Sequence, residues 1–135
     1  MELFINTILY NHPNLRLCFA HLTGAGNYHP SVADTFDILI QARENNSQLK
    51  KENLYVDLAG VFNDKPTRYF KGVTKKLLTR MGKQLIKWGL DNVLWGSDNI
   101  EYYLNKTQSM WPLSAEEYNH TMSNDGHSFL DGYNV

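Results

Sequence analysis

The chain of 135 residues is poor in the features that mark secreted and membrane proteins. Its one cysteine, Cys18, excludes a disulfide within the chain and favours a reducing compartment, so we expect a cytoplasmic protein. No run of about 18 apolar residues is present to form a membrane-spanning helix. The residues Met1 to Ile5 lack the basic and long apolar regions of a secretory signal.

A strong excess of one charge is also missing. Thirteen lysines and arginines stand against 14 aspartates and glutamates, which gives a net charge of −1. Proteins that bind nucleic acid or anionic membranes are usually basic, so we expect neither as a partner. Hydrophobic residues make up 42% of the chain and charged residues 20%, as in ordinary globular proteins. We therefore interpret residues 1–135 as one domain.

The positive charge is concentrated in one stretch. Eight of the 13 basic residues lie between Lys65 and Lys87, where the sequence has no acid. Apolar residues recur there every three to four positions, which predicts an amphipathic helix that buries Tyr69, Val73, Leu77, Met81, Leu85 and Trp88. The lysines can form a surface for nucleic acid or an acidic partner, or simply the solvated face of the helix. We favour the solvated face, and no aromatic residues interleave with the lysines to stack on bases.

Three apolar runs predict buried strands, at Leu15–Ala20, Leu54–Ala59 and Val93–Trp95. Helices are expected at Phe4–Tyr10, from Pro30 to about Ala42, in the basic stretch up to Gly89, and from Ser114 to about Leu130. Ser114 and Glu117 have the spacing of a capping box. Strands that alternate with helices predict an α/β fold with a parallel sheet.

Polar residues follow two of these strands directly. His21 comes after the first strand, where it can be a metal ligand, a general base or a structural histidine bonded to a backbone carbonyl. Asp98 follows Gly96 and Ser97 after the third strand, where it can bind a cation and take a proton from water, or cap a turn. The carboxyl ends of parallel strands meet at one edge of a sheet, so a site is expected there.

Other residues near these strand ends are weaker candidates. The loop His21–Gly26 is expected to be flexible, and it lacks the pattern of a phosphate-binding loop. Asp57, inside its strand, can point into the sheet or pair with a lysine, and Cys18 is expected to be an inert hydrophobic residue. The residues that we name as candidates for contact with a substrate are Thr23, Gly24, His29, Asn63 and Asn99.

Three segments together resemble a known family. Arg16–Gly26, Asn53–Gly60 and Asp91–Asp98 look like the last three strand segments of an amidohydrolase-related TIM barrel, and Pro112–Glu117 is similar to its closing helix. The resemblance implies a partial (β/α)8 barrel with about three parallel strands, equivalent to the sixth to eighth, and their helices. One departure is Asn99-Ile100, where many members have an aromatic residue and then proline.

The resemblance also implies a chemistry. His21 would orient or activate a metal-bound water, and Asp98 would bind the metal, with zinc the expected ion, and accept the proton. The implied reaction is hydrolysis of a C–N, C–O or related bond in a small molecule, with decarboxylation as a related alternative. The family's His-x-His motif does not occur in this sequence, so we expect the chain to be inactive alone.

A partial barrel has further consequences for partners. It leaves two strand edges and one face of the sheet uncovered, so we expect self-association or pairing with a missing N-terminal half. An alternative is a non-catalytic remnant or interaction module that pairs through these edges. A weaker alternative is a binding domain that uses the lysine-rich helix.

Overall fold

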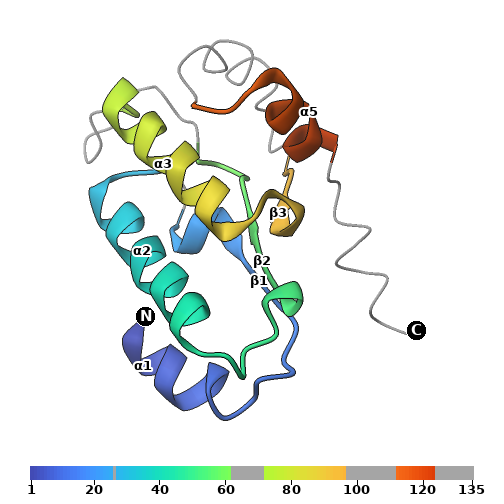
Figure 1. The fold of residues 1–135 in the computed structure, drawn as a ribbon. Coiled ribbons are helices and arrows are strands. Elements are labelled where there is room, and N and C mark those ends of the chain that lie inside the picture. Colours follow the sequence, from blue (N-terminus) through green and yellow to red (C-terminus); the bar gives the residue numbers. More distant parts are fainter. Residues whose placement is uncertain (26, 62–71, 97–111, 124–135) are drawn as a thin grey trace.

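The computed structural model describes residues 1–25, 27–61, 72–96 and 112–123. It has an α/β fold with a three-stranded parallel sheet, and its strands are β1 (Leu17–Phe19), β2 (Leu54–Asp57) and β3 (Val93–Leu94) (Figure 1). The three predicted strands are thus confirmed, each shorter than its apolar run. Within the described residues the sheet is open, with β2 between the edge strands β1 and β3.

The register aligns the three strands at their carboxyl ends. Phe19 lies opposite Val56, and Val56 lies opposite Val93. All three residues of β1 are half-buried, whereas Leu54 to Val56 and both residues of β3 are buried. Of the two edge strands, β1 is thus the more exposed.

Four α-helices lie in the described residues: α1 (Glu2–Phe4), α2 (Pro30–Asn45), α3 (Lys75–Trp88) and α5 (Ala115–Ser123). The first continues as a π-helical turn over Ile5–Leu9, so the predicted N-terminal helix is present with a wider winding. Short 3₁₀ turns occupy Ala20–Thr23, Lys51–Asn53 and Leu90–Asn92. In these parts of the chain no helix has the length and apolar character needed to cross a bilayer.

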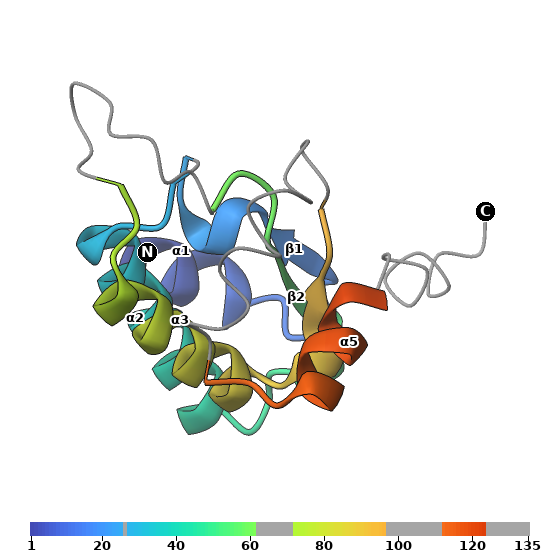
Figure 2. The ribbon, with the colours of Figure 1, turned by 90° about the horizontal axis from the view of Figure 1, so that it is seen from above.

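Helices cover one face of the sheet. Viewed from above, α1, α2 and α3 gather on one side of the strands and α5 lies beside β3 (Figure 2). The core between them includes Val56, Phe36 and Trp88, whose two rings are 5.5 Å apart between centroids. Val32, Phe36, Leu39 and Ile40 are buried, as the helical pattern predicted.

The opposite face of the sheet carries Cys18, Tyr55 and Leu94, because strand residues alternate in direction. Tyr55 and Leu94 are only 6% and 8% exposed. Arg16 lies over the Tyr55 ring, 5.5 Å from its centroid. The expectation that this face is uncovered is therefore wrong at these two positions.

The basic helix α3 begins at Lys75, later than the pattern predicted, so Val73 precedes the helix. Met81, Leu85 and Trp88 are buried and Val73 and Leu77 half-buried, while Tyr69 lies outside the described residues. Thr74 caps the helix by accepting a hydrogen bond from the Leu77 amide, and Gly89 ends it with a φ of 101°, a conformation that favours glycine.

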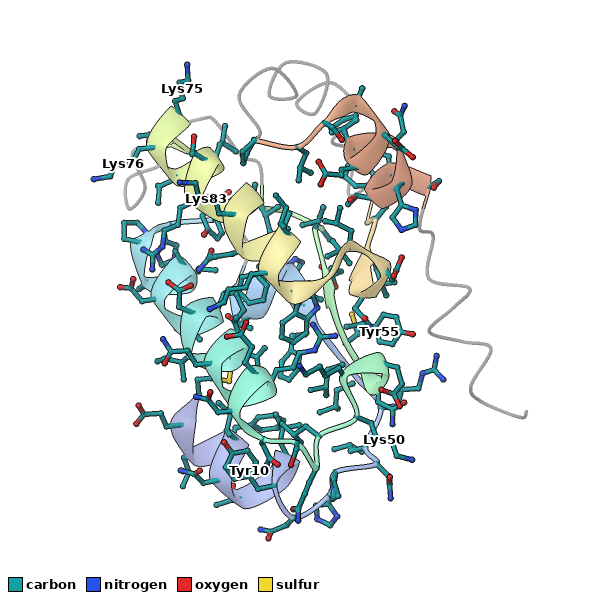
Figure 3. All side chains as sticks on the ribbon, viewed as in Figure 1. Tyr10, Lys50, Tyr55, Lys75, Lys76 and Lys83 are labelled. Carbon is teal, nitrogen blue, oxygen red and sulfur yellow. The ribbon has the colours of Figure 1, made fainter. Side chains whose placement is uncertain are left out.

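Polar contacts bind α3 to α2. The Arg80 guanidinium donates to Asp34 and Asp37 at 2.7 and 2.6 Å, and the buried Gln84 amide donates to Asp37 at 2.6 Å. Burial raises the pKa of the Asp37 carboxyl, but these hydrogen bonds outweigh it, so the pKa lies below its usual value. Lys75, Lys76 and Lys83 project into solvent (Figure 3), a position that suits a solvated face and a partner surface equally.

A buried arginine of α2 contacts the carboxyl end of α3. Arg43, 6% exposed, lies 4.2 Å from the centroid of the Trp88 ring. Its guanidinium donates to the carbonyls of Trp88 and Lys51 and to the Asn92 side chain. Burial lowers the pKa of Arg43 to about 10, and the Trp88 carbonyl at the end of α3 gains a donor that the helix itself cannot supply.

The start of α5 confirms the predicted capping box. The Ser114 amide donates to the Glu117 carboxylate at 2.7 Å, and the Glu117 amide donates to the Ser114 hydroxyl at 3.2 Å. Pro112 packs on α3 at Gly82, where a Cβ atom would lie 2.3 Å from the proline ring. The predicted part of this helix beyond Ser123 lies outside the described residues.

Candidate functional site

The chain leaves β1 through an unusual turn at the carboxyl edge of the sheet. His21, Leu22 and Thr23 have φ angles of 52°, 52° and 74°, in the left-handed region that non-glycine residues avoid. Leu22 is fully buried, and the Gly24 amide donates to the His21 carbonyl at 3.0 Å. The expected flexible loop is thus a defined turn over its first residues.

Asp57, the last residue of β2, joins this turn to the end of its own strand. Its Oδ1 atom accepts hydrogen bonds from the backbone amides of His21, at 2.9 Å, and Ala59, at 3.1 Å. The sequence left open a carboxylate in the sheet's interior or one paired with a lysine; among the described residues it is bound instead to backbone amides at the carboxyl edge of the sheet. Its partners are backbone amides, which satisfy a carboxylate without a lysine.

The His21 ring is held by one of its two nitrogens. Nδ1 contacts the carbonyl oxygen of Ala59, and because a carbonyl only accepts, this nitrogen carries the proton. His21 therefore makes the bond to a backbone carbonyl that is expected of a structural histidine. This bond occupies Nδ1 alone, and Nε2 has no hydrogen-bond partner among the described residues. The side chain is 34% exposed, so Nε2 can serve as a ligand or a base.

Cys18 lies next to this group without adding a reactive thiol. Its sulfur is 4.0 Å from Asp57 Oδ2. Burial and the negative charge of Asp57 raise the pKa of the thiol to about 12, so the thiolate is scarce at neutral pH. This agrees with the unreactive residue that we expected.

The other candidate residues divide into two groups. Thr23 and Gly24 lie in and after the left-handed turn, and His29 precedes α2, with its Nδ1 2.9 Å from the Ser31 hydroxyl. Gly24 packs against Val32, where a Cβ atom would be 2.8 Å from Cγ2. Asp98, Asn63 and Asn99 lie outside the described residues.

The end of β3 approaches the same place. A Cβ atom on Gly96 would lie 2.8 Å from the Cβ atom of Ala59, the residue that contacts the His21 ring. Only glycine allows this approach, which brings the chain that leads to Asp98 beside the exit of β2. The requirement gives Gly96 in the Gly-Ser-Asp motif a structural role of its own.

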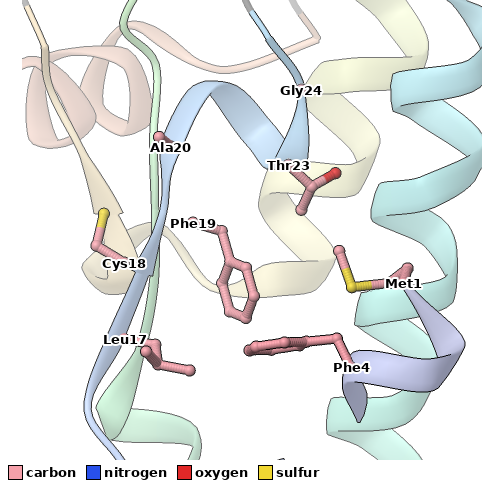
Figure 4. Close-up of a pocket in the computed structure, with 8 residues that line it drawn as sticks. All are labelled: Met1, Phe4, Leu17, Cys18, Phe19, Ala20, Thr23 and Gly24. Atoms are coloured by element: carbon pink, nitrogen blue, oxygen red, sulfur yellow. The ribbon is translucent and has the colours of Figure 1, made fainter. Parts of the chain in front are cut away.

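An apolar hollow of about 380 Å³ lies between β1 and α1 (Figure 4). Phe4 of α1 and Phe19 of β1 face each other in it, with ring centroids 5.9 Å apart. Thr23 also lines the hollow, and its buried hydroxyl has no hydrogen-bond partner in the described part of the chain. The hollow borders the turn that carries His21, but it is formed by the helix-covered side of β1.

The described residues do not by themselves form a metal site. They contain no group of three or more histidine, cysteine, aspartate or glutamate side chains that could hold an ion. His21 offers one suitable nitrogen, whereas zinc in a catalytic site takes three protein ligands. A metal at this edge would therefore need ligands from elsewhere.

Sequence reasoning named His21, but it did not connect Asp57 with His21 and did not single out Ala59. Asp57 was visible as an acid in an apolar strand followed two residues later by an alanine and then a glycine. Its contact with His21 depends on the register of β1 and β2, which no local pattern reveals.

No family model matches the chain, and no curated protein or solved structure matches it. The likeness to amidohydrolase-related enzymes is therefore carried by the strand-end motifs alone.

Proposed function

We propose that this chain contributes His21 and Asp98 to the site of an amidohydrolase-related, metal-dependent hydrolase. One observation carries the proposal: the His21 ring is fixed through Nδ1 at the carboxyl edge of a parallel sheet, with Nε2 unbonded among the described residues. Metal-binding histidines commonly have their second nitrogen fixed by a carbonyl or carboxylate in this way. The sequential order of the parallel strands also supports a segment of a (β/α)8 barrel.

The roles of the residues follow from their chemistry. A bound divalent ion such as zinc lowers the pKa of water and supplies a nucleophile near neutral pH. His21 would use Nε2 to bind or orient groups at that position. Asp98, which the motif places after β3, would serve as ligand and proton acceptor. The substrate would be a small molecule with a C–N, C–O or related bond, and a decarboxylase would use the same two residues.

The donor set limits what the chain does alone. His21 is one ligand and Asp98 would be a second, and the described residues offer no group that completes the set, so we propose that another polypeptide segment supplies the remaining ligands. We therefore expect weak zinc binding and no hydrolysis by the isolated chain.

Calorimetric titration with zinc tests this proposal. We expect weak binding of one equivalent, which is lost in His21→Gln and in Asp98→Asn. His12→Gln is the control, because His12 lies in an exposed turn away from the sheet edge, and it should bind zinc as the wild type does. Tight stoichiometric zinc that Asp98→Asn abolishes would contradict the incomplete site. Binding that is unchanged in both site variants would contradict the site itself.

A second candidate is an interaction module that pairs through its sheet edges. The observation that favours it is the exposure of β1, whose three residues are all half-buried beside an apolar hollow. Such an edge can add a further strand. This function needs no metal, so zinc binding separates the two candidates.

A further inference from the structure

The contact between the His21 ring and the Ala59 carbonyl depends on where the backbones of these two residues lie, and one carboxylate holds both backbones. The ring belongs to the turn after β1 and the carbonyl belongs to the loop after β2. Both residues donate their backbone amide to the same atom, Oδ1 of Asp57. The geometry points to Asp57 as the positioning residue of His21, which sets the ring tautomer with Nδ1 protonated and Nε2 unprotonated.

The turn gives a reason why such an anchor is needed. Non-glycine residues enter the left-handed region at a cost, and here three do so in succession, starting with His21. The hydrogen bond from the His21 amide to Asp57 holds the first of them. A hydrogen bond to an ionised acceptor is about twice as strong as one between neutral groups, so a carboxylate suits this task.

Asp57 acts through the backbone and not on the ring itself. Its Oδ1 atom is 3.8 Å from His21 Nδ1, which is too long for a hydrogen bond. The ring proton is directed to the Ala59 carbonyl instead. Removal of the Asp57 carboxylate should therefore change the ring only by releasing the two amides that bring ring and carbonyl together.

The use of this arrangement rests on the proposed function, because a fixed Nδ1–H makes Nε2 the coordinating atom. The tautomer itself can be measured without metal, substrate or activity. Failure of zinc to bind would overturn the proposed function and leave the positioning role standing. A ring tautomer that is independent of Asp57 would overturn the positioning role alone.

The test is a ¹⁵N spectrum of the histidine ring nitrogens in the full chain at about pH 8, where an ordinary imidazole is neutral. In the wild type we expect the His21 ring in one form, protonated at Nδ1. Asp57→Asn should keep this form, because its amide oxygen still accepts both backbone bonds. Asp57→Ala should give a mixture of tautomers. Asp34→Asn, which changes an exposed acid on α2, is the matched control and should leave His21 unchanged.

The proposal is overturned if folded Asp57→Ala keeps the single wild-type tautomer. A measurement on the wild type covers the case in which that variant does not fold. Hydrogen exchange should show the amides of His21 and Ala59 protected, because Asp57 accepts both. Exchange of these two amides as fast as in an unfolded chain would also overturn the proposal.

Discussion

Three successive residues, none of them glycine, adopt left-handed backbone angles after the end of β1. Each such residue costs about 1 kcal/mol or more, and the buried Leu22 side chain and the bonds of Asp57 offset this cost. Strain of this kind often accompanies functional positions. At this turn it lies at the histidine that carries the proposed chemistry.

Replacing Thr23 with glycine should stabilise the protein by about 1 kcal/mol, because glycine adopts a positive φ without strain. The change also removes a buried hydroxyl that has no partner among the described residues. Leu22→Gly is the comparison, since Leu22 also has a positive φ, 52° against 74° at Thr23, but this variant loses a fully buried side chain. Loss of a buried leucine side chain costs about 2–5 kcal/mol, so this variant should be less stable. Urea unfolding measures both, and a destabilised Thr23→Gly would show that the turn is not strained at Thr23.

The sequence allowed His21 to be named but not its partners. A histidine after an apolar run is visible locally, whereas the acceptor of its ring proton is the backbone carbonyl of Ala59, which any residue would provide. Asp57 is visible as an acid, but its bond to the His21 amide depends on a left-handed turn that His-Leu-Thr does not indicate.

The helices show how much of their structure the spacing of apolar residues predicts. Apolar spacing predicted the buried face of α3, and Gly89 marked its end because only glycine readily takes the φ found there. The end of α2 was placed too early, at Ala42 instead of Asn45. Arg43 is the reason: it reads as a polar residue beyond the apolar pattern, but it is buried against Trp88 and extends the helix.

The contact between α2 and α3 should weaken in acid. The pKa of Asp37 is lowered in the folded state, so its carboxylate stabilises the protein above the unfolded pKa of 3.8, and this stability is lost as pH falls through the lower folded value. We expect Asp37→Asn to lower the urea midpoint at pH 7 and to reduce the loss of stability between pH 5 and pH 3. Glu116→Gln, at an exposed position in α5, should leave both unchanged. An acid loss equal to that of the wild type in Asp37→Asn would contradict this role.

At the scale of the whole molecule, the sheet is the feature that sequence predicted best. Alternating apolar runs and helices gave three parallel strands, because such strands need cover on both faces and connections long enough to cross over. The uncovered face was predicted wrongly at Tyr55, since Arg16, near the start of the first apolar run, lies over its ring. No local pattern distinguishes an arginine that covers a tyrosine from one in solvent.

The exposed edge at β1 should lead the chain to associate with itself. Size-exclusion chromatography should show an apparent mass above 15.6 kDa that rises with protein concentration. Strand pairing and apolar contact do not depend on charge, so 1 M salt should not dissociate the complex. A monomer at every concentration would argue against pairing through the edge, and dissociation by salt would point to the lysines of α3 instead.

The measurement that tests the central claim most directly is the ¹⁵N spectrum of the His21 ring with and without zinc. We expect zinc to shift Nε2 and to leave Nδ1 protonated, because Nδ1 is bound to the Ala59 carbonyl and only Nε2 can coordinate. In Asp98→Asn, which should lose zinc binding, the same zinc concentration should leave Nε2 unshifted. A His21 ring that zinc leaves unchanged, or one that loses its Nδ1 proton to the metal, would contradict the proposed site.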